Sequence, residues 1–133
     1  RRNELVVGIE LPPVSFGDHH TYLKISDPHA FAFSIISVAV GLEMGGDTIR
    51  HGRVALGGVA TRPWYVPAVA DMLRDRQPSD ALFHDVARRL LQGALADGGN
   101  SDKLALAPRV IRRALWQAAM GSPQSTTEAP SLS

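Results

Sequence analysis

The sequence predicts an α+β fold, in which one small antiparallel sheet is covered by helices. Segments rich in β-branched residues occupy the first half of the chain, and apolar residues at helical spacing occupy the second half. Strands followed by helices, rather than strands alternating with them, are typical of this class. A length of 133 residues fits a single domain. We expect a domain over residues 1–120 with about three strands and about three C-terminal helices.

Three segments rich in β-branched and small apolar residues are predicted as strands: residues 4–11, 33–44 and 48–60. Pro12-Pro13 ends the first, and a loop over residues 14–18 follows it. Gly45-Gly46-Asp47 turns the chain between the other two, so these form an antiparallel hairpin. Gly57 and Gly58 allow another element to approach the backbone closely.

After Pro63 the apolar residues recur at helical spacing, which predicts two helices. These residues are Val66, Val69, Met72 and Leu73 in the first helix, and Phe83, Val86, Ala87, Leu90, Leu91, Ala94 and Leu95 in the second. Asp80 is the expected N-cap of the second helix, and Gly98-Gly99 its stop signal. A third helix is expected from about Pro108 to Ala118. Residues 121–133 are predicted to be a disordered tail, because Ser, Pro, Thr and Gln dominate there.

Composition excludes several classes of protein. A net charge of +1, with scattered arginines, favours neither a nucleic acid nor a membrane surface as a partner. Without cysteine the chain has no disulfides, no cysteine-ligated iron–sulfur cluster and no thiol nucleophile. No run of about 20 apolar residues predicts a membrane helix, and no signal-peptide pattern opens the chain. The first residue is not methionine, which we interpret as a sign of a longer parent.

A search for catalytic motifs finds no Gly-x-Gly-x-x-Gly, no Walker phosphate loop and no Gly-x-Ser-x-Gly elbow. His19 and His20 follow Asp18, but neighbours on an extended chain point to opposite faces, which favours an exposed loop over a metal site. A free-standing hydrolase is disfavoured, since no nucleophile and base are placed together. We therefore expect the isolated chain not to be catalytic.

Three aromatic residues are interpreted from their positions in the sequence. Trp64, between Pro63 and Tyr65, is either a packing anchor or an interface contact. Phe31 and Phe33 alternate and so share one face, which on pattern alone favours core packing.

Several stretches in order resemble a known family: Tyr22-Leu23-Lys24, Ala30-Phe31-Ala32-Phe33-Ser34, Ser37-Val38-Ala39, Arg53-Val54-Ala55-Leu56-Gly57-Gly58-Val59-Ala60, Arg62-Pro63-Trp64, residues 100–107 and residues 109–115. They resemble the C-terminal domain of the FAD-carrying medium subunit of the molybdenum hydroxylases. That group includes xanthine dehydrogenase, aldehyde oxidoreductase and carbon monoxide dehydrogenase, and the Ala-Leu-Gly-Gly-Val-Ala pattern is most similar to the bacterial aldehyde oxidoreductases. The resemblance covers residues 4–119.

The resemblance implies a domain of an electron-transfer subunit. In such enzymes a molybdenum cofactor on a large subunit oxidises the substrate, and iron–sulfur clusters on a small subunit pass electrons to FAD on the medium subunit. The glycine-rich segments that bind FAD belong to the N-terminal domain of the medium subunit. The implied partners are therefore that N-terminal FAD-binding domain, the iron–sulfur small subunit and the molybdenum large subunit. The implied compartment is the cytoplasm, or the periplasm if a partner subunit exports the complex.

The resemblance also implies three cofactor-binding residues. Lys24 matches a family lysine near the flavin ring, where a cation stabilises negative charge on reduction. Phe31 matches a position that packs against the ring, which leaves its role open between core and flavin contact, and Asp27 is the acidic member of the loop between them. Ser26 and Pro28 replace arginines common in the family. The alternative function is a non-catalytic interaction module of the same fold, in which Trp64, Tyr65 and exposed arginines meet a partner.

Overall fold

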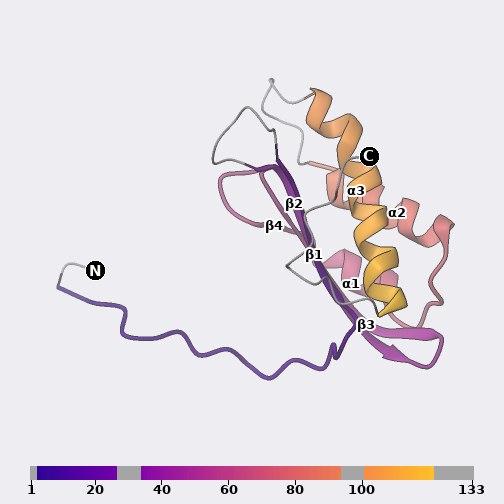
Figure 1. Ribbon diagram of the computed structural model, residues 1–133, viewed down its shortest axis with the longest axis horizontal. Helices are drawn as coiled ribbons and strands as arrows, with labels where there is room; N and C mark the ends of the chain where they lie inside the picture. Colours follow the sequence, from indigo (N-terminus) through magenta and orange to yellow (C-terminus); the bar gives the residue numbers. More distant parts are fainter. Residues whose placement is uncertain (1–2, 27–33, 94–100, 122–133) are drawn as a thin grey trace, which may run out of the picture.

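The computed structural model describes residues 3–26, 34–93 and 101–121, and it shows a sheet with helices packed on one side (Figure 1). The strands are β1 (His20–Ser26), β2 (Ser34–Gly45), β3 (Thr48–Gly57) and the short β4 (Trp64–Tyr65). They lie in the order β1-β2-β3-β4, and every neighbouring pair is antiparallel. The helices α1 (Ala68–Leu73), α2 (Asp80–Leu91) and α3 (Ser101–Met120) follow. The α+β prediction is confirmed.

Successive side chains along the strands point to opposite faces of the sheet. Val38, Val40 and Leu42 of β2 point to the helices and are buried. Val54 and Leu56 of β3 pair with Val40 and Val38 and are also buried. The helices contribute Phe83, Leu90, Ile111 and Leu115 to the same core. One apolar core therefore lies between the sheet and the helix layer.

The hairpin of β2 and β3 was predicted and is confirmed, although β3 ends at Gly57 rather than at Ala60. Gly46 has a φ of +63° in the turn, a conformation that favours glycine. Ile49 ties the hairpin to the segment after α1, because its N–H donates to Arg76 O at 2.8 Å and its carbonyl accepts from Asp75 N at 2.7 Å.

The predicted first strand over residues 4–11 is wrong, because that segment pairs with no strand among the described residues and carries no strand assignment. The third long strand is instead β1, whose residues Thr21, Leu23 and Ile25 face the helices. Its other residues are polar or aromatic, so β1 has no continuous apolar run. A strand needs a neighbouring backbone, and apolar composition alone does not supply one.

Two helix boundaries differ from the prediction. The N-cap of α2 is Ser79, whose Oγ accepts from Leu82 N at 3.1 Å, and Asp80 is the first helical residue. Helix α3 begins at Ser101, so Pro108 lies inside it rather than at its start. Trp116 and Asp80 link the two helices, because the indole Nε1 donates to Asp80 Oδ1 at 2.9 Å. The predicted stop at Gly98-Gly99 and the disordered tail beyond residue 121 lie outside the described residues.

Candidate functional site

The face of the sheet opposite the helices carries the residues with potential function. Strand pairing aligns them in three rows across the strands. The rows are His20–Gly41–Arg53, Tyr22–Ala39–Ala55–Tyr65 and Lys24–Ser37–Gly57. We call this surface, made of these three rows, the open face.

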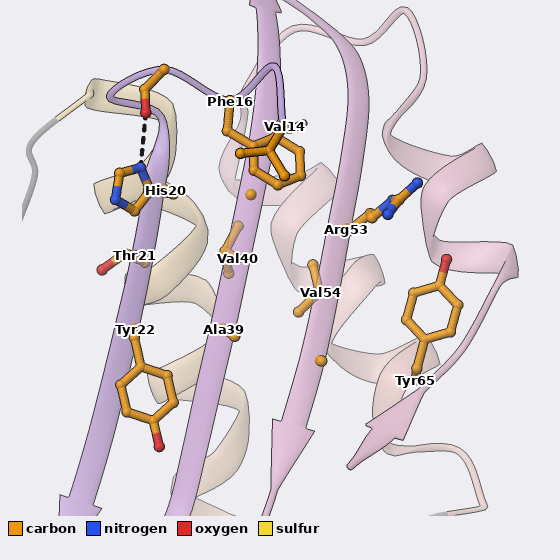
Figure 2. Close-up of a pocket in the computed structure, with 13 residues that line it drawn as sticks. Val14, Phe16, His20, Thr21, Tyr22, Ala39, Val40, Arg53, Val54 and Tyr65 are labelled. Atoms are coloured by element: carbon orange, nitrogen blue, oxygen red, sulfur yellow. Dashed lines mark hydrogen bonds between the residues drawn. The ribbon is translucent and has the colours of Figure 1, made fainter. Parts of the chain in front are cut away.

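The first and middle rows line a hollow of about 830 Å³ (Figure 2). Ala39 and Ala55 are its floor, because their side chains are too short to fill the space between the edge strands. Tyr22 on β1 and Tyr65 on β4 stand at its two sides and are 57% and 47% exposed. An aromatic pair on a floor of small residues makes a surface suited to receiving a flat or apolar group.

Val14 and Phe16 close one end of this hollow from the segment before β1 (Figure 2). The ring of Phe16 lies against Gly41, where a β-carbon would stand 2.5 Å from Phe16 Cε2. Glycine at position 41 therefore makes room for the ring, as a strand glycine at a close approach commonly does.

The histidines of this region bond to the backbone. His20 Nδ1 lies 2.9 Å from Gly17 O, and His19 Nδ1 lies 2.9 Å from Ala118 O. Among residues 3–26, 34–93 and 101–121, no group of three or more metal-ligating side chains could hold a metal ion. The two histidines hold the turn at Gly17 and the end of α3 in place.

Lys24 is placed on the open face, where it is exposed and paired across the sheet with Ser37. It lies two residues beyond Tyr22 on β1 and does not line the hollow. In the same row, Ser37 of β2 is paired with Gly57 of β3. The Ser37 side chain occupies the space that a side chain at Gly57 would need. Ser37 is only 8% exposed, so the sheet beside Lys24 is largely covered, whereas the Lys24 side chain itself is exposed. The other two predicted site residues, Asp27 and Phe31, lie outside the described residues, as does Phe33.

Trp64 is a packing anchor and not part of the open face. Its indole Nε1 donates to Leu90 O at 2.8 Å, and the ring packs against the core. Tyr65 points the other way and walls the hollow. The pairing of Tyr22 with Tyr65 across two alanines was missed in the sequence. Its only signal there is the small residues at alternate positions of β2 and β3, which mean little until the register is known.

In the part of the chain that the structure describes, no helix combines the length and apolar character needed to cross a lipid bilayer.

The fold defines a class: a four-stranded antiparallel sheet with one open face and three helices behind it. Residues 21–102 match the family model for the CO dehydrogenase flavoprotein C-terminal domain, and the chain belongs to that family. The match covers β1 from its second residue, the other three strands, α1 and α2.

The proteins similar to this chain include one curated relative and two solved structures. The relative is the aldehyde oxidoreductase FAD-binding subunit PaoB of Escherichia coli (strain K12), 36% identical over 115 residues, which are 86% of this chain and 33% of the relative. Quinoline 2-oxidoreductase from Pseudomonas putida 86 superposes with a TM-score of 0.68 at 23% identity, over 80% of this chain and 38% of that one. CO dehydrogenase from Oligotropha carboxidovorans superposes with a TM-score of 0.68 at 21% identity, over 86% and 40%. The two structures support the fold, and the chain spans about a third of the curated relative.

Proposed function

We propose that this chain acts as the C-terminal domain of the FAD-carrying electron-transfer subunit of a molybdenum-dependent hydroxylase, of the aldehyde or xanthine dehydrogenase type. Membership of the flavoprotein C-terminal family supports this function. The observation that carries it is the open face, where Lys24 is exposed two residues along β1 from Tyr22, which lines the hollow. In this function the domain lends contacts to a flavin that another part of the subunit binds.

The described residues fit a bordering role toward FAD. The open face is a shallow surface with an exposed cation at one edge and exposed tyrosines in the middle row. Such a surface can cover one side of a flavin ring system but cannot enclose the whole molecule. FAD supplies the capacity to accept and pass on electrons.

Lys24 acts in this proposal as a fixed positive charge at the flavin. Reduction places negative charge on the ring system, and a nearby ammonium group stabilises that charge more strongly than the oxidised form. In this proposal Phe31 contacts the flavin ring, and Asp27 is the acidic residue between Lys24 and Phe31 in the sequence. The iron–sulfur small subunit and the molybdenum large subunit complete the electron pathway. The complex works in the cytoplasm, or in the periplasm if a partner exports it.

The assembled complex that contains the complete subunit tests this function through Lys24→Ala. We expect flavin reduction by substrate to slow by about tenfold, equivalent to about 1.4 kcal/mol, or FAD content to fall. Lys24→Arg keeps the charge and should stay close to wild type. Arg62→Ala removes an exposed charge from the loop before β4 and is the matched control. Stopped-flow flavin absorbance and FAD per subunit are the readouts.

Wild-type flavin content together with wild-type reduction rates in Lys24→Ala would refute the role of this lysine. A complete wild-type subunit that contains no FAD would instead favour the alternative, a protein-interaction module of the same fold without flavin, for which Tyr65 and the exposed arginines are candidate contacts.

A further inference from the structure

The segment before β1 exposes an unusual amount of apolar surface. Its aliphatic side chains are 80–94% exposed, in a set that comprises Leu5, Val6, Val7, Ile9 and Leu11. Single exposed aliphatic residues are ordinary, but a continuous group is typical of a surface that another body covers.

The base of this segment is held firmly against the domain. Phe16 lies on Gly41, and Ser15 Oγ donates to Glu43 Oε2 at 2.8 Å. His19 N donates to Phe16 O at 2.9 Å, which closes the turn into β1. Pro12 and Pro13 then stiffen the exit from the domain, since the proline ring fixes φ. The segment therefore leaves the domain at a defined place.

The segment has the pattern of a strand. Leu5, Val7, Ile9 and Leu11 occupy alternate positions, so an extended backbone puts them on one face, with Val6 and Glu10 on the other. Its N–H and C=O groups form no strand ladder within residues 3–26, 34–93 and 101–121. Figure 1 shows the chain from its N-terminus running away from the sheet, on the side opposite α2 and α3.

We propose that residues 5–11 add as a strand to the edge of a β-sheet in the FAD-carrying part of the same subunit. The face with Leu5, Val7, Ile9 and Leu11 would be buried in that sheet's core, and main-chain hydrogen bonds would supply the pairing. This inference rests on the proposed function, because it takes its partner from the subunit proposed there.

Two observations select this partner. The chain matches 33% of the FAD-binding relative, so a subunit of that size has ample sequence for a second sheet. The segment also leaves from the end of the hollow that Val14 and Phe16 close, on the side of the open face. One body on that side would cover both the segment and the open face, which also brings Lys24 next to the part that carries the flavin.

Amide hydrogen exchange on the complete FAD-loaded subunit tests the strand. We expect residues 5–11 to exchange at least about tenfold more slowly than the exposed loop around Arg62, because ladder hydrogen bonds protect amides. Exchange as fast as that loop, in a subunit with its full FAD, would overturn strand addition and leave the proposed function standing. A wild-type subunit without FAD would instead overturn the proposed function, on which this partner depends.

Two further outcomes of the exchange experiment would identify a different pairing partner for residues 5–11. Protection that grows with protein concentration would mean pairing with a second copy, and equal protection in residues 1–133 alone at low concentration would mean pairing with the domain's own sheet. Either result would overturn the proposal. Ile9→Asp should abolish the protection, because it places a charge in the buried face. Glu10→Gln, on the other face, is the matched control and should keep it.

Discussion

Phe16 and Gly41 are in direct contact although 25 positions separate them in the sequence, and a β-carbon at Gly41 would stand 2.5 Å from the ring. The contact joins the segment before β1 to the middle of β2. It closes one end of the hollow on the open face and fixes where the preceding segment leaves the domain. A single glycine thus shapes both the candidate site and the proposed interface.

Gly41→Ala should displace Phe16 and destabilise the fold by about 1–3 kcal/mol, because the ring has to leave its site. Urea unfolding followed by tryptophan fluorescence measures the change. The double variant Gly41→Ala with Phe16→Ala should recover part of the loss, since the small side chain removes the clash. Independent, additive effects of the two changes would contradict the contact.

Trp64→Phe should destabilise the fold by about 1–3 kcal/mol. The change removes the hydrogen bond to Leu90 O and leaves the carbonyl at the end of α2 without that partner, in addition to the lost ring volume. Thermal unfolding measures the effect. Tyr65→Phe is the control, because its side chain is nearly half exposed and should change stability by less than about 0.5 kcal/mol. Equal effects from both changes would argue against Trp64 as the anchor.

Ser79→Ala should destabilise α2 by about 1 kcal/mol, since it removes the oxygen that caps Leu82 N. Asp85→Ala breaks an exposed ion pair with Arg88 on the same helix and should cost less than about 0.5 kcal/mol. Urea midpoints of the two variants compare the contributions. If both variants cost the same, the cap at Ser79 contributes no more than a surface ion pair.

The hairpin and the helix layer were predictable because local signals encode them. Gly45, Gly46 and Asp47 form a turn between two apolar segments, and Phe83, Val86 and Leu90 repeat at helical spacing. The first strand was predicted at residues 4–11 instead of at β1, because local signals are misleading for both segments. The apolar segment finds no partner within the described residues, whereas β1 pairs with β2 through a sequence that mixes His20, Tyr22 and Lys24 with apolar residues.

The candidate site was only partly predictable. Lys24 came from the family resemblance; the structure gives its position on the open face, and its role toward a flavin stays a prediction. The hollow between Tyr22 and Tyr65 depends on the register of four strands, which brings together residues 43 positions apart. Such a register is set by the pairing of the strands in the fold, and the residues next to either tyrosine in the sequence do not predict it.

The visible absorption spectrum of the complex that co-purifies with the complete subunit tests the central claim most directly. The account predicts flavin bands over iron–sulfur absorbance, and bleaching of both when an aldehyde or a purine is added under anaerobic conditions. A colourless preparation that contains other proteins would contradict it, and the open face would then be a surface for protein interaction alone.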